Sequence, residues 1–596
     1  MKELMLGNKA FARGLYEAGC CFVSSYPGTP STEVTEEAAK YDEIYCEWAP
    51  NEKVAMEAAF GASLAGVRSY CGMKHVGLNV AADPLYTMSY TGVNGGVIIC
   101  VADDAGMHSS QNEQDSRHHA IASKVPMLEP SDSAEALEFV KTGYELSEQF
   151  DTPVIIKMCT RVSHSQSVVE VSDRVVPAKK GYEKNIPKNV MMPGNAIKRH
   201  PFVEERTEKL RQWSENASVN RIEWAKDSAR NADGKTVGII TCSTTYQYVK
   251  EAFGEAVSVC KIGMVNPLPK DLILDFAKKC DILIVAEELD PIIENHCKAL
   301  GLNVHGKDIL PICGEFSQNL IAKALSPFVY GKESDPVEIV KVEDQIPMRP
   351  PVMCAGCPHR GLFYTLSKNK CTVLGDIGCY TLGAVAPLSA MDMTLCMGAS
   401  ISAIHGFNIA GEGEHENKTV AVIGDSTFMH SGMTGLANIA YNQSDSTVII
   451  LDNSITGMTG HQQNPTTGYN IKGDPAGKID LEALCRSMGF HRVRVVDPYD
   501  LKATDAAVKE ELAAKEPSVI ISRRPCALLK YVKHNPPLCV DKEKCVGCKS
   551  CMKLGCPAIS MKDGKAHIDE TLCVGCGICS QLCPTGAFAG CKKEEA

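Results

Sequence analysis

The sequence lacks the segments that would insert a protein into a membrane or direct it out of the cell. No run of about 18 consecutive apolar residues occurs, so we expect no transmembrane helix. Residues 1–4 do not begin a basic segment followed by a long apolar run, so we expect no secretory signal. We therefore expect a cytoplasmic protein with reduced cysteines, which oxygen would damage if they bind redox centres.

An excess of basic residues is also missing. The chain has 61 Lys and Arg against 72 Asp and Glu, which gives a formal net charge of −11 at pH 7. This balance argues against nucleic acid as the main partner. The hydrophobic fraction of 44% is ordinary for a soluble globular protein, so 596 residues can form several packed domains.

Cysteine, by contrast, is abundant, and eight of the 28 cysteines form two runs in the last part of the chain. The first run is Cys545, Cys548, Cys551 and Cys556, and the second is Cys573, Cys576, Cys579 and Cys583. A proline follows the last cysteine of each run, a pattern typical of a pair of [4Fe–4S] clusters, which soft thiolates suit. The alternatives are a zinc module or a disulfide knot, but zinc usually takes two Cys-x2-Cys pairs. Most of the remaining cysteines lie in apolar segments and are expected to be reduced core residues.

The two runs are expected to exchange their fourth ligands, because in two-cluster ferredoxins the cysteine before proline binds the cluster of the other run. The predicted ligand sets are Cys545, Cys548, Cys551 and Cys583 for one cluster, and Cys573, Cys576, Cys579 and Cys556 for the second. The first run has one extra residue before its last cysteine, so its loop departs from the usual spacing.

Hydrophobic and polar segments divide the chain into three α/β units and the cysteine-rich tail. Residues 1–175 and 233–335 alternate helical segments with short apolar strands. The expected strands include 96–102, 153–158, 235–241, 257–264 and 281–287. Residues 176–232 are polar and contain prolines, which predicts a linker or an excursion over another domain. A third α/β unit covers 345–530, and an α+β domain with both cysteine runs covers 536–591.

The third α/β unit contains a pattern that resembles the thiamine diphosphate motif. A strand at 419–423 runs into Gly424, Asp425 and Ser426, and Asn453 stands just beyond a second strand at 447–451. The motif usually has Gly-Asp-Gly and an Asn-containing turn, so Ser426 and Asp452 depart from it. A diphosphate needs a Mg²⁺ ion held by oxygen ligands, and neighbouring parallel strand ends converge on such a site. The resemblance implies that Asp425, Asn453 and the Ile455 carbonyl bind the metal; the alternative is an ordinary turn after a buried strand.

Two further segments favour the cofactor interpretation. Glu52 begins a helical segment, and thiamine enzymes carry a Glu there that hydrogen-bonds the aminopyrimidine ring and promotes its imino form. The alternative is that acids simply favour helix N-termini. Gly375, Asp376 and Gly378 form a glycine-rich loop, followed by Cys379, whose backbone N–H groups suit phosphate oxygens.

A thiamine core joined to a ferredoxin-like tail resembles the large subunits of indolepyruvate ferredoxin oxidoreductases, in the 2-oxoacid:ferredoxin oxidoreductase superfamily. The resemblance runs from end to end and includes the loop around Thr29, which in the family contacts the 2-oxoacid. The same loop can also be read as a Pro-Gly turn before a helix capped by Ser31 or Thr32. The implied fold is α/β, with doubly wound thiamine diphosphate-binding units, a transketolase C-terminal-like domain at 233–335 and an α+β two-cluster ferredoxin domain.

The resemblance also implies a third [4Fe–4S] cluster beside the thiazolium. Its ligands would be Cys354, Cys357, Cys379 and Cys526, which match a Cys-x2-Cys pair, a Gly-Cys loop and a Cys near the end of the thiamine domain. The alternatives are that Cys354 and Cys357 are a free dithiol near the cofactor, or that Cys526 is a core residue.

The activity implied by the resemblance is oxidative decarboxylation of aryl 2-oxoacids, such as indolepyruvate, to aryl-acetyl-CoA with coenzyme A and oxidised ferredoxin. The family has a separate small (beta) subunit, so we expect a hetero-oligomer. Two alternatives stay open: another 2-oxoacid, such as pyruvate or a branched-chain acid, or a non-catalytic electron-transfer scaffold. Ser426 and Asp452 are the hints for the scaffold, and the retention of Glu52, Asp425 and Asn453 argues against it.

Residues that would contact the substrate cannot be ranked from the sequence. The candidates for an apolar wall are Met458, His359 and Met429. A substrate carboxylate usually pairs with Arg, and the candidates are Arg117 and Arg161. A polar loop with His108, His118 and His119 could reach the site, although a solvated loop is the simpler interpretation.

Overall fold

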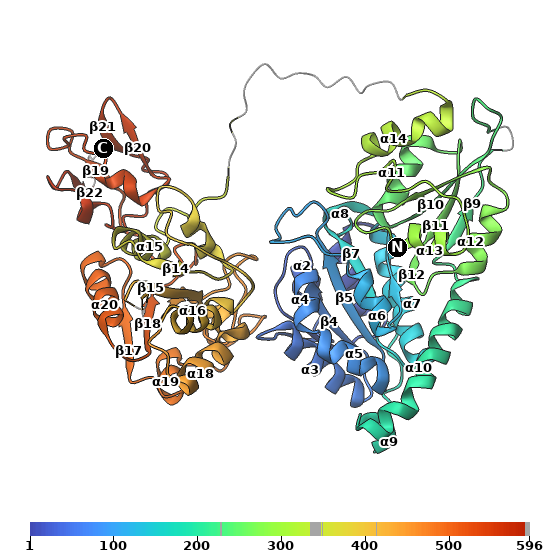
Figure 1. The fold of residues 1–596 in the computed structure, drawn as a ribbon, viewed down its shortest axis with the longest axis horizontal. Helices are drawn as coiled ribbons and strands as arrows, with labels where there is room; N and C mark the ends of the chain where they lie inside the picture. The colour runs from blue at the N-terminus through green and yellow to red at the C-terminus, as the bar shows by residue number, and fades with distance from the viewer. Residues whose placement is uncertain (227–228, 334–346, 348–349, 413, 416, 591–596) are drawn as a thin grey trace. The chain divides into compact units, whose positions relative to one another are not determined.

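The computed structural model describes residues 1–226, 229–333, 347, 350–412, 414–415 and 417–590 (Figure 1). It divides into two compact units, residues 1–342 and 343–596, and each is described by itself. The predicted boundary between residues 335 and 345, and the predicted domain end at 591, lie outside the described residues. Within the described ranges, no helix combines the length and the apolar character that a bilayer span requires.

The first unit begins with a seven-stranded sheet in the order β12-β6-β7-β5-β4-β2-β3 (Figure 1). All neighbours pair in parallel except β12 with β6. The strands are β2 (Phe22–Ser25), β3 (Tyr45–Trp48), β4 (Ser69–Lys74), β5 (Val97–Asp103), β6 (Met127–Leu128), β7 (Val154–Cys159) and β12 (Met264–Asn266). Every residue of β4, β5 and β7 is buried, as expected for parallel strands covered on both faces. The expected strands at 96–102 and 153–158 are therefore confirmed within a residue or two.

Eight helices belong to this first domain in the described part of the chain. They are α1 (Gly7–Glu17), α2 (Thr32–Ala38), α3 (Glu52–Leu64), α4 (His75–Val80), α5 (Ala82–Thr91), α6 (Arg117–Ser123), α7 (Ser133–Phe150) and α8 (Thr160–His164). A small antiparallel pair, β1 (Lys2–Leu6) and β8 (Gln166–Glu170), joins the start of the domain to its end.

The second domain of this unit has a four-stranded sheet in the order β13-β10-β11-β9. Its strands are β9 (Arg221–Glu223), β10 (Val237–Cys242), β11 (Ser258–Ile262) and β13 (Ile282–Ala286). Its helices are α11 (Ser243–Phe253), α12 (Lys270–Ala277), α13 (Ile292–Ala299) and α14 (Gln318–Tyr330). The parallel core β13-β10-β11 confirms the α/β pattern read from the sequence, and the edge strand β9 runs antiparallel.

The single strand expected at 257–264 was wrong. The chain leaves β11 at Ile262 and enters the other sheet as β12, which pairs with β6. Gly263 allows this change of sheet, because a Cβ at this position would lie 2.2 Å from the carbonyl oxygen of Val219. Its N–H donates to Asn220 Oδ1 at 2.7 Å. The two domains of this unit therefore share a sheet as well as a connection.

The polar excursion at 176–232 contains ordered structure. It forms α9 (Ile186–Asn189), α10 (Pro193–Ser214) and then β9, and α10 packs against α5. The guanidinium of Arg206 is buried and donates to the Asp151 carbonyl at 2.8 Å and to Ser89 Oγ at 3.0 Å. These contacts fix the excursion on the first domain, which agrees with the wrapped-excursion interpretation rather than a free linker.

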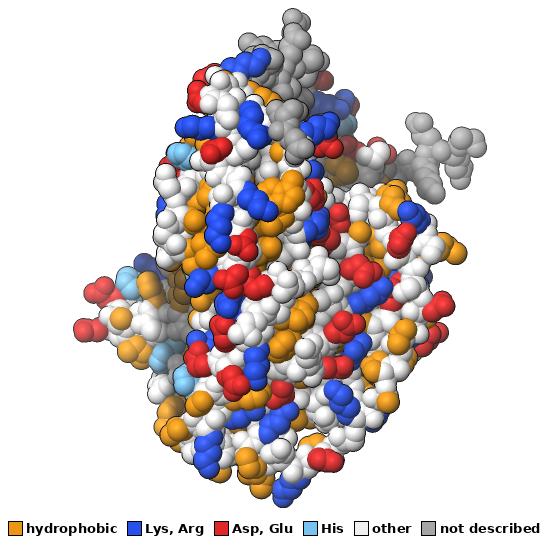
Figure 2. Space-filling view, turned by 90° about the vertical axis from the view of Figure 1, so that its right-hand side faces the viewer, with side chains coloured by type: hydrophobic (Ala, Val, Ile, Leu, Met, Phe, Trp, Pro, Cys, Tyr) orange, Lys and Arg blue, Asp and Glu red, His pale blue; other side chains and the backbone are white. Residues whose placement is uncertain are grey.

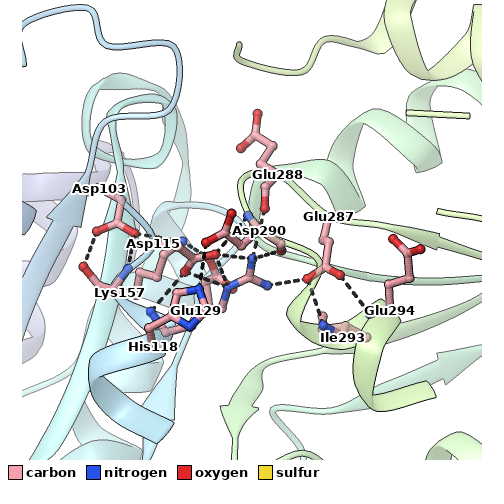
Figure 3. Close-up of polar contacts among 12 residues, drawn as sticks. Asp103, Asp115, His118, Glu129, Lys157, Glu287, Glu288, Asp290, Ile293 and Glu294 are labelled. Atoms are coloured by element: carbon pink, nitrogen blue, oxygen red, sulfur yellow. Dashed lines mark hydrogen bonds and ion pairs between the residues drawn. The ribbon is translucent and has the colours of Figure 1, made fainter. Parts of the chain in front are cut away.

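A buried ionic network connects the two domains of the first unit (Figure 3). Arg117 is 1% exposed and pairs with Asp115 at 2.6 Å and with Glu287, from the second domain, at 2.5 Å. Glu287 also accepts the N–H groups of Ile293 and Glu294. Burial alone would raise the pKa of Asp115, but the charge of Arg117 outweighs it and holds that pKa at about 2. Asp115 and Glu287 therefore share one buried cationic partner, Arg117.

Replacing Arg117 with Met should destabilise the first unit by about 3–5 kcal/mol, because Asp115 and Glu287 would be left buried without a cation. Denaturant unfolding of the purified chain would measure the loss. The control is Arg161→Met, which removes an exposed guanidinium paired with Glu315 and should cost at most about 1 kcal/mol. Equal losses in the two variants would show that the buried network does not hold the domains together.

The second unit begins with a fully parallel five-stranded sheet in the order β14-β15-β16-β18-β17 (Figure 1). The strands are β14 (Thr372–Leu374), β15 (Thr419–Gly424), β16 (Thr447–Asp452), β17 (Arg492–Val496) and β18 (Ser518–Arg523). The helices are α15 (His359–Lys368), α16 (Ala399–Ala410), α17 (Asp425–Thr427), α18 (Met433–Asn442), α19 (Leu481–Ser487) and α20 (Leu501–Ala513). A 3₁₀ helix, Cys379–Ala384, and a π-helical turn, Phe428–Gly432, also form; π-turns are frequent at functional sites. Strands β15 and β16 confirm the two strands expected around the thiamine motif.

The small C-terminal domain pairs strands far apart in sequence. Strand β19 (Leu538–Val540) pairs with β22 (Phe588–Gly590), and β20 (Ile559–Lys562) pairs with β21 (Lys565–Ile568), both antiparallel. Short 3₁₀ turns, Ser550–Leu554 and Ser580–Leu582, lie within the two cysteine runs, each ahead of its last cysteine. Because β19 and β22 bracket both runs, the ends of this domain are fastened to each other.

Charges of both signs are interspersed on the face seen in Figure 2. Lys and Arg side chains alternate there with Asp and Glu, and apolar groups lie between them. This face therefore offers no continuous basic surface to a polyanion.

Candidate thiamine diphosphate and iron–sulfur sites

Asp425 and Asn453 lie at the carboxyl ends of neighbouring parallel strands, as the sequence predicts. Asp425 follows β15, Asn453 follows β16, and the two strands pair in register up to Gly424 and Leu451. The two side chains are 2% and 8% exposed, so both face the interior of this edge. Ligands usually bind at the carboxyl ends of the strands in open parallel sheets.

The electrostatics at Asp425 fit a cation site. Its carboxylate accepts the Ser426 N–H at 2.7 Å and faces Thr466 Oγ1 at 3.4 Å. Burial, and then the charge of Asp452, raise the pKa of Asp425 to about 8. No basic side chain in the described residues forms an ion pair with it, so a divalent ion would supply the missing positive charge.

The remaining predicted metal ligands lie in the turn after Asn453. Asn453 Oδ1 accepts the Ile455 N–H at 3.2 Å, which folds the turn back on itself. Carboxylate, amide and carbonyl oxygens are the donors that Mg²⁺ takes in proteins, so Asp425, Asn453 and Ile455 fit the expected ion. Ser426, the departure from the usual Gly, accepts a hydrogen bond from Thr456 Oγ1 at 2.9 Å and so fastens the two motif loops together.

The glycine-rich loop is held by Asp376 rather than by its glycines alone. Asp376 is completely buried and accepts the N–H groups of Ile377 and Gly398 at 2.9 Å and of Ser400 at 3.0 Å. Its carboxylate therefore orders this loop and the start of α16. Side chains would not fit on Gly375 and Gly378, where a Cβ would lie 2.4 Å from Met391 and from Tyr380, respectively.

Four cysteines gather beside the Asn453 turn. Burial, then the charges of Cys526 and Cys354, raise the pKa of Cys379 to about 11. Burial, with the charges of Cys354 and Cys379, also raises the pKa of Cys357. Cys526 donates its N–H to the Asn453 carbonyl at 2.9 Å. Gly457 lies next to Cys379, since a Cβ built on it would lie 3.5 Å from Cys379 Sγ. All four thiols are free, which both a cluster and a dithiol would allow.

The eight cysteines of the two runs surround two separate cavities. One is lined by Cys545, Cys548, Cys551 and Cys583. The other is lined by Cys556, Cys573, Cys576 and Cys579. In the described residues no three His, Cys, Asp or Glu side chains converge on one ion position. A four-iron cluster does not need that geometry, because each of its irons takes one thiolate.

Backbone N–H groups point at several of these sulfurs. Cys545 Sγ accepts the Ala566 N–H at 3.4 Å, and Cys583 Sγ accepts the Ala587 N–H at 3.2 Å. Such bonds favour thiolate and tune the potential of a bound cluster.

Glu52 lies at the start of α3 in the first unit and is 4% exposed. The helix cap is Asn51, whose side chain accepts the Val54 N–H at 2.9 Å, so Glu52 is not needed for capping. Gly77 of α4 leaves room for the carboxylate, because a Cβ there would lie 2.5 Å from Glu52 Oε1. Glu52 is therefore a buried carboxylate with space left for it by a glycine, unlike the exposed acids that usually begin helices.

Comparison with known proteins assigns the whole chain to one family. The chain is 40% identical to the indolepyruvate oxidoreductase subunit IorA of Pyrococcus horikoshii, over 100% of this chain and 98% of that protein. It is 38% identical to the IorA subunit of Archaeoglobus fulgidus, over 99% and 98% of the two chains. The chain belongs to the IorA family.

Family models match three segments of this IorA-family chain. Residues 13–232 match the thiamine diphosphate-binding domain of pyruvate flavodoxin/ferredoxin oxidoreductases, and residues 376–522 match the C-terminal TPP-binding domain of thiamine pyrophosphate enzymes. Residues 566–589 match a 4Fe–4S binding domain. A 2-oxoglutarate:ferredoxin oxidoreductase from Magnetococcus marinus is 19% identical, with a TM-score of 0.45 over 55% of this chain and 65% of that one. The three family-model matches confirm the thiamine-binding α/β and ferredoxin-like fold class.

Thr29 lies in a half-buried loop, but the helix cap expected beside it was wrong. Helix α2 begins at Thr32, and its preceding residue, Ser31, makes no side-chain cap. The Ser31 hydroxyl instead donates back to the Gly28 carbonyl at 2.9 Å, because Ser31 itself is in helical backbone conformation. The loop is thus closed on itself ahead of the helix.

Lys74 is a cation that sequence reasoning missed in this IorA-family chain. It ends β4, is 9% exposed, and its Cβ lies 3.0 Å from a Cβ built on Gly28 of the Thr29 loop. Its Nζ donates to the Ser109 carbonyl at 2.7 Å, and burial lowers its pKa. The signal in the sequence was its position at the end of a buried strand next to β2.

The other substrate-side candidates divide between buried and exposed positions. Arg117 is wrong as a carboxylate ligand, because all three guanidinium nitrogens already bind protein oxygens. Arg161 pairs with Glu315 and is exposed. Of the three histidines expected in a polar loop, only His108 lies in one, and it contacts Glu315. His118 and His119 lie in α6 and contact Asp290 and Asn79, respectively.

The three apolar-wall candidates also differ. His359 and Met429 are each 4% exposed, whereas Met458 is 53% exposed. The His359 ring lies 3.5 Å from the Asn453 amide, and burial lowers the pKa of His359 to about 4. Burial therefore favours the neutral form of His359, which lies beside the turn after Asn453.

Proposed function

We propose that this chain is the thiamine- and cluster-carrying subunit of an enzyme that oxidatively decarboxylates aryl 2-oxoacids, with indolepyruvate as the type substrate. The products are the aryl-acetyl-CoA, CO2 and reduced ferredoxin, and coenzyme A is the acyl acceptor. The observation that carries this proposal is the 40% sequence identity with an IorA subunit over the full length of the chain. The oxygen donors at the ends of β15 and β16 agree with it. The IorA name itself points to an enzyme of more than one subunit.

Each cofactor has its own residues in this proposal. Asp425, Asn453 and the Ile455 carbonyl hold Mg²⁺, and the loop of Gly375, Gly378 and Gly424 gives room to the diphosphate. Thiamine diphosphate supplies an electron sink for the loss of CO2. Glu52 holds and exchanges a proton at the aminopyrimidine ring.

Substrate recognition is assigned to the first unit. Thr29 contacts the 2-oxoacid, and Lys74, at the base of the Thr29 loop, provides the positive charge for its carboxylate. What supports Lys74 is its burial beside Gly28, with its charge facing one carboxylate, Asp104, at a distance of 3.9 Å.

The cysteine cavities support the crossed cluster assignment. Cys583→Ser should weaken the cluster of Cys545, Cys548 and Cys551, whereas Cys556→Ser should weaken that of Cys573, Cys576 and Cys579. Electron paramagnetic resonance of the reduced protein can follow the two signals separately. The control is Cys313→Ser, which changes an exposed free cysteine outside every predicted ligand set. Damage confined to the mutated cysteine's own run would contradict the crossing.

The proposal is tested on protein purified without oxygen. We expect thiamine diphosphate, magnesium and roughly twelve iron atoms per chain if the third cluster forms, or roughly eight if it does not. Adding the small subunit should bring coenzyme A-dependent viologen reduction by indolepyruvate well above that with pyruvate. Full activity from this chain alone would overturn the two-subunit claim, and the absence of thiamine diphosphate would overturn the function.

A further inference from the structure

Arg360 is a buried cation without an anionic partner. It is the second residue of α15 and 3% exposed. Its guanidinium donates to the carbonyl oxygens of Leu554 and Met353 at 2.6 Å and of Cys354 at 3.1 Å. Its Nε has no acceptor in the part of the chain that the structure describes, and no carboxylate there forms an ion pair with it.

This arrangement differs from that of Arg117, a buried arginine of the first unit. Arg117 is matched by two carboxylates, so its charge is compensated within the protein. Carbonyl dipoles orient Arg360 but do not cancel its charge, and an uncompensated buried charge costs several kcal/mol. An anion next to this guanidinium would therefore stabilise the protein.

The position of Arg360 identifies that anion. Arg360 lines the cavity that is also lined by Cys556, Cys573, Cys576 and Cys579. Ala355 and Gly356, between Cys354 and Cys357, line the same cavity.

The carbonyls that Arg360 binds come from both cysteine segments. Leu554 stands two residues before Cys556, and Met353 and Cys354 begin the Cys-x2-Cys segment. The same side chain therefore holds a ligand loop of the ferredoxin-like domain against the thiamine-binding domain. A close backbone approach supports this seam, because Gly356 faces Val574, where a Cβ would lie 2.2 Å away.

We propose that Arg360 is the counter-charge of the cluster bound by Cys556, Cys573, Cys576 and Cys579, and that it sets the reduction potential of this cluster. The inference rests on the cluster assignment in the proposed function. A cluster that gains one electron gains one negative charge, so a fixed positive charge stabilises the reduced form more than the oxidised form. Arg360 thus makes the cluster easier to reduce and acts as a positioning residue, since it touches neither substrate nor thiamine.

The test compares Arg360→Gln and Arg360→Lys with the parent in the complete two-subunit enzyme. Gln keeps a hydrogen-bond donor but loses the charge. Lys keeps the charge but loses the planar guanidinium with its several N–H donors. Anaerobic redox titration followed by electron paramagnetic resonance should show at least a tenfold fall in the reduced-to-oxidised ratio of one cluster at fixed potential in R360Q, which is about 59 mV for one electron. R360K should stay within that tenfold limit. The control is Arg492→Gln, which removes an arginine of β17 that is already paired with Glu511, and should leave both potentials unchanged.

The outcomes separate this inference from the proposed function. Full iron content in R360Q with an unchanged potential would overturn the role of Arg360 and leave the function standing, as would an equal shift in R492Q. If R360Q fails to assemble its cluster, R360K decides: a parent-like potential supports the counter-charge, and a tenfold shift overturns it. Absence of this cluster from the parent enzyme would overturn both proposals.

Discussion

Glu52→Gln should lower turnover by at least about 100-fold while leaving thiamine diphosphate and iron contents unchanged. Gln has the shape of Glu but cannot exchange a proton, so it can occupy the buried space beside Gly77 without performing acid–base chemistry. The direct measurement is the exchange of the thiamine C2 proton for deuterium, followed by NMR after an acid quench. That exchange should slow in parallel with turnover, which a purely structural role would not produce.

The matched control for this variant is Glu57→Gln on the same helix. Glu57 is exposed and pairs with Lys53 at the helix surface, so its loss should change turnover less than about twofold. If Glu52→Gln and Glu57→Gln exchanged the C2 proton at the same rate, Glu52 would be only a helix-start acid, and the assignment of α3 to the pyrimidine side would fail.

The local part of the thiamine site could be predicted because each of its segments, a buried strand followed by polar residues, is continuous in the sequence. A buried apolar run fixes β15, and the first polar residue after it, Asp425, must then stand at the carboxyl end of the sheet. The same reasoning placed Asn453 after β16. The cysteine spacings worked similarly, since each run brings three thiols together within one short loop.

The parts that could not be predicted depend on contacts between distant segments. The pairing of Arg117 with Glu287 joins residues 170 positions apart, and periodicity carries no record of it. The change of sheet at Gly263 depends on the carbonyl of Val219, and the burial of Lys74 depends on the Thr29 loop. Nothing in the sequence distinguishes Arg360 from an ordinary helix residue, because one of its three carbonyl partners lies 194 positions away.

These misses have a common physical form. Each is a charged side chain, or a glycine, at a contact between two segments that are distant in the sequence. Hydrophobic periodicity reports which face of an element is buried but not what is buried against it. A buried charge is stable only beside a partner, so its role can be identified only when the structure shows which groups surround it.

Asp425→Ala should abolish the binding of Mg²⁺ and, with it, of thiamine diphosphate, because the diphosphate would meet no cation at the end of β15. The isosteric Asp425→Asn should lose the cofactor as well, although it keeps a side chain that can face Ser426 and Thr466. Calorimetric titration of the metal-free protein with the cofactor, with and without magnesium, measures both losses.

The control is Asp452→Asn, which removes the neighbouring carboxylate that pairs with Arg523 and is not a predicted ligand. It should keep magnesium-dependent binding, since the predicted oxygen donors remain. A second readout is independent of the cofactor: a buried carboxylate without a cation costs free energy, so metal-free Asp425→Asn should melt no lower than the metal-free parent. Native cofactor affinity of Asp425→Ala in the presence of a chelator would show that the metal lies elsewhere, and a sharp drop in melting temperature would show that Asp425 serves the fold rather than the ion.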